Sequence, residues 1–550
     1  MEDSFPPLPG ATAPNGLMSG AMGPPAPPGQ ASGSSSNTKK TRIISPDANF
    51  VLDFTAPSSQ SQKLAPARYL MGVSSTALKE SSAYFRVILD PDKFREGREL
   101  FERKAQLDSE CGMSELSTDD ATALAELPTL SLELPPIGGV SDKADLLEAF
   151  LKVLHIGRDK LHGVDAQEFL QQLAKKSISF IANLIVLSDR FDGQQVLSRV
   201  LDTPLGGKRD STGDMMISKA LRRLQTPKLE DEDRTRQAIY VALFLGDKEG
   251  IMTFTHRLVI DGSKEWVYGG RDGWVGIDRP LWWHLPNGIE EELRFRHQCI
   301  LDTITDLQSH FLRAYGALPP QPSQQPSQQQ PSPMAPPSSA SSTTKLQCRR
   351  MYENSRSCDS FHLGEIIRFF STRTKTLHLE SSLSYQAPDP DEDEYDEEYP
   401  NNIPGNNNPY PDPTPTNIPT LLTSLRQCPE YQIDPNHAGC GLRRRLLPAL
   451  DCLATFTTNS HSAVGICPIH YDNDNPQQST TRTPTSARTG SWRNPKFRDK
   501  VKVSIGAGKV ESVTYLVDGA VNGELAMTCT CVVNAELARI VFTAGRRWNL

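Results

Sequence analysis

Two tight pairs of histidine and cysteine are the residues of this chain whose types and spacing best suit chemistry. His437-x-x-Cys440 and Cys467-x-x-His470 each place an imidazole three positions from a thiol. Imidazole nitrogen and thiolate sulfur are the ligands that zinc prefers, and four of them complete a tetrahedral structural site. The two pairs together therefore form a candidate zinc site.

Two observations argue against a bound metal. The stretch between the two pairs is longer than in the common zinc-finger patterns. Four other cysteines have no partner at ligand spacing, and these are Cys348, Cys358, Cys428 and Cys452. Buried cysteines also pack as small apolar residues without any metal. The sequence alone thus favours a chain without metal or other cofactor, and the two pairs remain the candidate ligands if a metal is bound.

Nucleophilic catalysis and nucleotide binding find little support in the sequence. His437 and Cys440 could form a dyad, but a dyad needs a third group that orients the base, and the sequence supplies none. The G-x-S-x-G motif does not occur. The run GAGK at 506–509 resembles the end of a phosphate-binding loop, yet Val503 stands where glycine is needed and Val510 where serine or threonine is needed. We therefore predict that the protein is not an enzyme, and we assign no catalytic or cofactor-binding residue.

Charge and composition argue against nucleic-acid binding. The formal net charge is −8, and part of the negative charge lies in the acidic run at 388–399. The basic run at 443–445 could contact phosphate, but such contacts need a larger positive surface, so carboxylates of this protein are the expected partners. No classical zinc-finger, homeodomain or basic-helix pattern occurs. A nucleic-acid-associated transcriptional regulator is kept as the alternative function.

An ordered scaffold is predicted to begin with residues 47–89. Asn49–Phe54 and Tyr69–Val73 are short apolar runs separated by a polar turn, which is typical of two buried strands. Ser74 and Ser75 follow, and a serine hydroxyl caps a helix by accepting from its first N–H groups. Apolar residues then recur at helical spacing, namely Ala77, Leu78, Tyr84, Phe85 and Leu89. The pattern predicts two strands followed by one amphipathic helix.

This order of elements resembles the opening of a BTB/POZ domain, as found in fungal BTB/POZ domain-containing proteins. The residues that carry the resemblance are Val73, Leu78, Ser81, Ser82, Tyr84 and Phe85. The runs LPNGIEEEL, DPNHAGCGLRRRLLPALD and GICPIH look like further segments of the same group. The resemblance implies an α+β fold, in which a small sheet with a helix cluster precedes a mainly helical region with disordered insertions. It also implies protein–protein interaction, as an adaptor or scaffold, through partner recruitment or self-association.

The resemblance further implies a set of partner-binding residues. In that family a cullin ubiquitin ligase is often docked through an apolar-x-Glu tripeptide after the first core helix. Phe94-Arg95-Glu96 lies at about that place, and the pair Phe101-Glu102 follows closely. An apolar side chain can fill a pocket of the partner and carry most of the binding energy, while the carboxylate orients it. Phe94, Glu96, Phe101 and Glu102 are therefore the predicted contacts, and a cullin substrate adaptor is a specialised form of the predicted function.

Composition shifts divide the chain into segments. We expect a disordered tail over 1–42, the BTB/POZ-like domain over 43–203, a helical region with a β-hairpin and a long helix over 214–316, a Pro/Gln/Ser-rich linker over 317–345, an ordered segment over 346–386, an acidic and Asn/Pro-rich disordered insertion over 387–419, a helical segment carrying both His/Cys pairs over 420–471, and an uncertain tail over 472–550. The hairpin is expected at 257–268 around an Asp-Gly turn. The long helix is expected from Ile289 over about 27 residues, bracing the second half against the first domain. In the tail, VKVSI, VTYLVDG and ARIVFTAG are strand-like.

Compartment and membrane association follow from what the sequence lacks. The first residues, MEDSFPPLPG, are acidic and proline-rich, unlike a secretory signal. No apolar run approaches the ~20 residues that span a bilayer. We expect an intracellular protein with reduced thiols and protein partners, in the nucleus or the cytoplasm.

Overall fold

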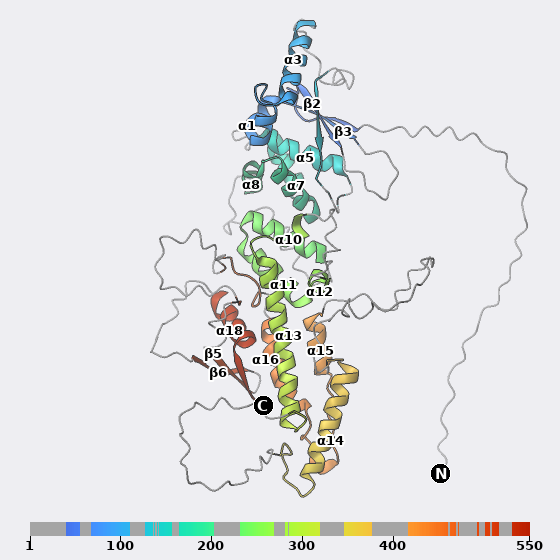
Figure 1. Ribbon diagram of the computed structural model, residues 1–550, viewed down its shortest axis with the longest axis vertical. Coiled ribbons are helices and arrows are strands. Elements are labelled where there is room, and N and C mark those ends of the chain that lie inside the picture. The colour runs from blue at the N-terminus through green and yellow to red at the C-terminus, as the bar shows by residue number, and fades with distance from the viewer. Residues whose placement is uncertain are drawn as a thin grey trace, which may run out of the picture.

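The structure is a computed structural model in which mixed helices and two small sheets form an elongated molecule (Figure 1). It describes residues 40–55, 68–110, 127–135, 137, 140, 142–156, 164–202, 232–268, 281–283, 285–318, 346–376, 416–459, 462–468, 471, 492–493, 501–506, 509–515 and 531–550. The expected linker at 317–345 falls outside them except for 317 and 318, as does the insertion at 387–419 except for 416–419. No helix among the described residues is both long and apolar enough to cross a membrane.

The N-terminal unit is built on a four-stranded sheet. Its strands are β1 (Lys40–Ile43), β2 (Phe50–Thr55), β3 (Arg68–Val73) and β4 (Thr129–Glu133), in the order β1-β3-β2-β4. β2 pairs antiparallel with β3, whereas β1 on β3 and β4 on β2 are parallel. In β4 the two leucines are buried and their neighbours exposed, as the alternating sequence predicts.

Strand β1 corrects the expected extent of the N-terminal tail. Residues 40–42 were expected to be disordered, yet they pair with Tyr69–Met71 of β3. The Arg42 guanidinium also forms ion pairs with Asp145 and Glu148. The polar composition of this stretch does not indicate a strand, because β1 is held by hydrogen bonds to β3 and by ion pairs instead of by apolar burial.

The helices of the N-terminal unit are α1 (Ser75–Ser81), α2 (Ala83–Ile88), α3 (Arg95–Glu110), α5 (Lys143–Ile156), α6 (Val164–Leu173), α7 (Ile178–Arg190) and α8 (Gln194–Asp202), and they cover the sheet. The first predicted helix is in fact two helices, α1 and α2. Ser82 separates α1 from α2 with an extended backbone at φ −139°. Its hydroxyl accepts from the N–H of Phe85 at 3.1 Å, so Ser82 caps α2. Ser74 precedes α1 but makes no side-chain cap.

The next unit is entirely helical where the structure describes it. It consists of α10 (Glu232–Leu245), α11 (Lys248–Asp261), α12 (Lys264–Tyr268), the short 3-10 turn Leu281–Trp283 and α13 (Ile289–Ala314). The hairpin expected at 257–268 is wrong, since this stretch is the end of α11 and all of α12. Gly262, at φ +76°, follows α11 as a terminating glycine. An Asp-Gly pair serves a helix end as well as a hairpin turn, and the pattern alone could not separate them.

The long helix α13 is confirmed, but its predicted bracing of the first unit is not what the main contacts show. Helix α10 packs against α7 and α11, whereas α13 packs against α11 and the C-terminal helix α18 (Cys531–Thr543). The Ser179 hydroxyl of α7 donates to the Gln237 side chain of α10 at 2.7 Å. The N-terminal unit therefore rests on the helical region chiefly through α10.

The C-terminal half surrounds the far end of α13 (Figure 1). Its elements are α14 (Ser355–Arg368), the π-helical turn Phe369–Arg373, α15 (Ile418–Arg426), the 3-10 turn Pro435–His437, α16 (Arg443–Thr457), β5 (Val501–Gly506), β6 (Lys509–Tyr515), α18 and β7 (Gly545–Asn549). The tail of uncertain structure thus contains a three-stranded sheet of order β6-β5-β7. ARIVFTAG was expected to be a strand but lies mostly in α18, where a helix presents its apolar residues to α13 and β5.

A buried histidine between α11 and α13 gives the fold a predicted pH dependence. His297 is 8% exposed, and its Nδ1–H donates to the Val259 carbonyl at 2.6 Å. Burial lowers the pKa of His297 from 6.5 to about 4. Between those two values the unfolded chain binds a proton that the folded chain excludes, so this contribution to stability is lost as the pH falls from 6.5 towards 4. The loss is about 3 kcal/mol.

Denaturant unfolding measured across this pH window checks the prediction. His297→Gln keeps a donor and removes the titration, so its free energy of unfolding should fall less steeply than that of the unmodified chain. Parallel slopes for the two proteins would contradict it.

Candidate functional site

The predicted partner-binding residues lie at the start of α3, at one end of the molecule (Figure 1). Phe94 is 45% exposed and Phe101 is 63% exposed, which is unusual for phenylalanine. They are seven positions apart, and because the Phe94 carbonyl accepts from the backbone N–H of Arg98, both lie on one helical face. The Glu96 and Glu102 side chains are also exposed. Phe94 thus lies just before α3 and the other three predicted residues lie on it, with Glu96 on a different face from the two phenylalanines.

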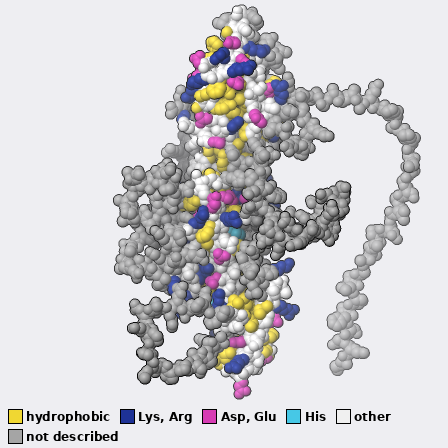
Figure 2. All heavy atoms as spheres, in the orientation of Figure 1, with side chains coloured by type: hydrophobic (Ala, Val, Ile, Leu, Met, Phe, Trp, Pro, Cys, Tyr) yellow, Lys and Arg dark blue, Asp and Glu magenta, His cyan; other side chains and the backbone are white. Residues whose placement is uncertain are grey.

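Among its described side chains, α3 is anchored near its start, by Gly97 and the partly buried Leu100. Gly97 is buried, and a Cβ at this position would lie 2.6 Å from the Asp90 carbonyl oxygen, so only glycine allows this close approach. Beyond Leu100 the described side chains of α3 are exposed. A helix without tertiary contacts gains little stability from propensity alone. Figure 2 shows hydrophobic side chains gathered on the described surface of this end of the molecule, bordered by charged ones.

The runs LPNGIEEEL and GICPIH meet at a buried ion pair. Arg296 donates through Nε to Glu292 at 2.8 Å and through Nη1 to the carbonyls of Val464 and Gly465 at 3.0 and 2.6 Å. A Cβ on Gly465 would lie 2.0 Å from the Met252 carbonyl oxygen, so the backbone of this run presses directly on α11. These runs therefore hold the helices together, which is a structural task.

Within the part of the chain that the structure describes, Arg443 and Arg445 contact neutral oxygens of this protein, whereas carboxylates were the expected partners. Arg443 donates to the carbonyl of Cys428 at 2.6 Å. Arg445 donates to the carbonyl and the side-chain oxygen of Gln347, both at 2.6 Å. Carbonyl groups left without partners at loop ends accept well from a guanidinium, and the sequence does not reveal such partners.

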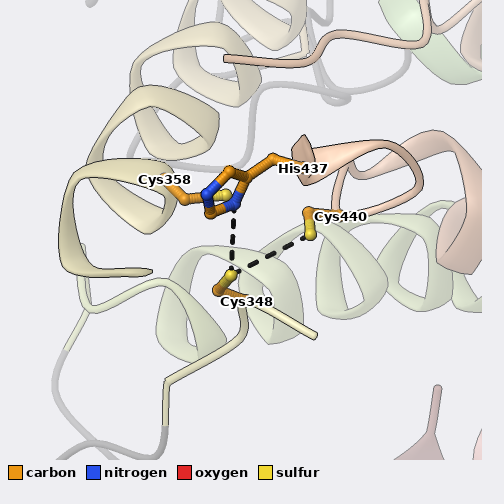
Figure 3. A group of neighbouring side chains, drawn as sticks. All are labelled: Cys348, Cys358, His437 and Cys440. Carbon is orange, nitrogen blue, oxygen red and sulfur yellow. Dashed lines mark hydrogen bonds between the residues drawn. The ribbon is translucent and has the colours of Figure 1, made fainter. Parts of the chain in front are cut away.

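Three cysteines and one histidine converge beneath α14 (Figure 3). Cys348 comes from the chain before α14, Cys358 from its first turn, and His437 and Cys440 from the turn before α16. Their ligand atoms all lie within 4.8 Å of one another. Cys348 Sγ is 3.4 Å from His437 Nδ1 and 4.0 Å from Cys440 Sγ. We call these four residues the thiol–imidazole cluster.

Local backbone geometry builds the two halves of the thiol–imidazole cluster. Asp434 caps the turn that carries His437, and the N–H of Cys440 returns to the His437 carbonyl at 3.2 Å. Gly439 has φ +76°, a conformation that glycine adopts at no steric cost, and Met351 after Cys348 has φ +56°. Each half is thus a tight turn that points a side chain inward.

Electrostatics distinguish the thiols of the thiol–imidazole cluster. Burial raises the pKa of Cys348. The Ser355 hydroxyl and the backbone N–H groups of Arg350 and Met351 lower this pKa by more than burial raises it, so that the pKa falls to about 6. Burial and the neighbouring Cys348 raise the pKa of Cys358. Cys348 therefore becomes a thiolate more readily than Cys358.

The second predicted pair is not part of the thiol–imidazole cluster. Cys467 follows Ile466, whose N–H donates to Thr255 of α11 at 2.9 Å, and His470 lies outside the described residues. Cys348 and Cys358, which the spacing had set aside, take the remaining places. Their only sequence signal was the presence of two cysteines close to an ordered helix, because their partners lie 79 or more positions away along the chain.

The geometry leaves no room for a catalytic dyad at His437 and Cys440. All four side chains of the thiol–imidazole cluster are at most 3% exposed, so a substrate has no approach to either group.

Comparison of the chain with protein-family models, with curated proteins and with solved structures found no match.

Proposed function

We propose that this protein is a non-catalytic adaptor or scaffold whose N-terminal unit, a BTB/POZ-like domain, recruits a protein partner through α3. The observation that carries the proposal is the exposure of Phe94 and Phe101 on one face of a helix that has few contacts of its own. Such aromatic side chains supply most of the energy of an interface when a partner buries them. The partner proposed is the N-terminal domain of a cullin, on the tripeptide Phe94-Arg95-Glu96.

The charges around the two phenylalanines fit a protein partner better than a nucleic acid. Along α3 acidic and basic residues alternate, and Arg95 is paired with Glu99 at 2.5 Å. A nucleic-acid site would need a continuous positive surface. The mixed charge supports an interface with an apolar centre and a polar rim.

Calorimetry of the full chain with a cullin N-terminal domain tests the proposal. Binding at micromolar concentrations is expected, and Phe94→Ala with Phe101→Ala together should weaken it by about tenfold or more, since each truncation removes an anchor. Ile367→Ala is the matched control, because Ile367 is a 38% exposed apolar residue on α14, at the other end of the molecule.

Two results would contradict the proposal: no heat at micromolar concentrations, or equal affinities for the unmodified chain and the double variant. Circular dichroism of the double variant should match that of the unmodified chain, because both side chains are exposed and their removal costs little stability. Sedimentation of the chain alone separates cullin docking from self-association.

A further inference from the structure

We propose that Cys348, Cys358, His437 and Cys440 bind one zinc ion as a closed structural site with three thiolate ligands and one imidazole ligand. The sequence alone favoured a chain without metal. The inference reverses that preference, because Cys348 and Cys358 lie beside His437 and Cys440 in the structure, in place of the predicted Cys467 and His470. It is independent of the proposed adaptor function, since the thiol–imidazole cluster lies at the opposite end of the molecule from α3 (Figure 1).

The spacing of the ligand atoms fits zinc. Zn–S bonds of about 2.3 Å and a Zn–N bond of about 2.0–2.1 Å, arranged tetrahedrally, separate the ligand atoms by about 3.5–3.8 Å. The S···N distance of 3.4 Å and the S···S distance of 4.0 Å lie on either side of that range. All separations are within 4.8 Å, so one ion can reach all four atoms with small side-chain movements.

The imidazole is oriented as a metal ligand. His437 Nδ1 faces the sulfurs, while Nε2–H donates to the Asn354 side-chain oxygen at 2.9 Å (Figure 3 shows the ring facing the sulfurs). This bond places the proton on Nε2 and leaves the lone pair of Nδ1 directed into the thiol–imidazole cluster. Metal-binding histidines are regularly held in this way by a partner on the other ring nitrogen. Asn354 is thus a positioning residue for the site.

Packing of small apolar residues does not explain the arrangement. The three cysteines form a buried group separate from the main core of the described residues, with Ile433 as a partly buried neighbour. A fully buried histidine ring, 0% exposed, points a nitrogen at a sulfur there instead of at an apolar surface. Cys348 and Cys440 are also too far apart for a disulfide, whose S–S bond is about 2.05 Å.

The surroundings suit the charge of the loaded site. With Zn²⁺ bound, all three cysteines are thiolates and any remaining Sγ–H protons have left to solvent, so three Zn–S bonds form and the site carries one net negative charge. Arg444 lies against the His-Cys turn, with Nη1 3.1 Å from the position that a Cβ of Gly439 would take. Arg445 holds the residue before Cys348 through two hydrogen bonds of 2.6 Å. Two guanidinium groups therefore contact residues next to the ligands Cys348 and Cys440.

The ion would join two segments that are distant in the sequence. Cys348 and Cys440 are 92 positions apart, and residues 377–415 between them lie outside the described residues. With four protein ligands and no open position, the site has the form of a structural one, and binding free energy of the metal becomes folding free energy of the parts it joins. The expected task is to hold α14 against the turn that precedes α16.

Elemental analysis of the purified full chain tests the inference. One equivalent of zinc is expected in the unmodified chain, with loss of most of it in Cys358→Ser and in Cys440→Ser. Cys452→Ser is the matched control, because Cys452 is also buried, at 2% exposed, and lies on α16 outside the thiol–imidazole cluster. This control should keep its full equivalent.

Two further measurements keep the test decisive if a ligand variant unfolds. Asn354→Ala retains all four ligands and should weaken zinc about 10- to 100-fold in competition with a chromophoric chelator. Cobalt added to the metal-depleted chain should give the visible absorption of thiolate-bound tetrahedral Co²⁺. No metal in the unmodified chain even after reconstitution with zinc, or full retention in both cysteine variants, would overturn the proposal.

Discussion

Replacing Arg236 by alanine is expected to lower the free energy of unfolding of the helical region by about 3–5 kcal/mol, because the change leaves the partly buried carboxylates of Glu232 and Glu290 without their buried cation. Arg236 is 0% exposed. It holds Glu290 with two bonds of 2.8 Å and Glu232 with a third. A fork of this kind uses the planar geometry of guanidinium, and lysine does not reproduce it.

Two tryptophans of the helical region contact Arg236 or its partner Glu290. Trp266 Nε1–H donates to Glu290 at 2.6 Å, and the carbonyl of Trp283 accepts from Arg236 at 2.7 Å. Trp282, at 0% exposed, fills the core of this region. Loss of Arg236 therefore disturbs both the ion pairs and the aromatic packing between α10, α12 and α13.

Denaturant unfolding followed by tryptophan fluorescence checks this prediction. The control is Arg257→Ala, because Arg257 pairs with the more exposed Asp261 at 3.5 Å within one helix, where an ion pair contributes about 1 kcal/mol or less. If Arg236→Ala shifted the unfolding midpoint no more than Arg257→Ala does, the result would contradict the prediction.

The sequence could predict those elements of the fold that are determined by contacts between residues near one another in the chain. The period of apolar residues placed α13 correctly, starting at Ile289, because helix formation and a buried stripe are set within a few turns. The same reasoning failed for ARIVFTAG, since a short apolar run fits a buried strand or a buried helix, and packing against α13 decided for the helix. Strand β1 was missed because its order comes from β3 and from two acidic residues of α5.

The candidate sites follow the same division. Phe94 and Phe101 could be singled out from a short local pattern, and their exposure depends on α3 projecting from its anchor at Gly97. The thiol–imidazole cluster could be predicted only by half. His437 and Cys440 lie in one turn, whereas Cys348 and Cys358 reach them through the packing of α14. Spacing rules describe ligands within one small module and do not extend to ligands joined by tertiary structure.

Phe191→Ala is expected to lower the free energy of unfolding of the N-terminal unit by about 3–5 kcal/mol, as for a large aromatic removed from a closed core. Phe191 is 1% exposed and follows α7. Four aromatic rings surround it with centroids 5.4 to 6.0 Å away, and these belong to Phe54, Tyr84, Phe85 and Phe150. The Ser82 hydroxyl also donates to the Phe191 carbonyl at 2.6 Å, so the residue anchors both packing and a buried hydrogen bond.

Hydrogen exchange of backbone amides is the most direct measurement for this variant, because it reports opening locally. Ser82, Tyr84 and Phe85, which carry the sequence pattern of the N-terminal unit, all contact Phe191, so α2 and α7 should lose protection together. Phe101→Ala is the control, with a change of at most about 0.5 kcal/mol expected for an exposed side chain. Helix α13 should stay protected in the Phe191 variant, since its main partners are α11 and α18. Equal loss of protection in α7 and α13 would show instead that the two units unfold as one.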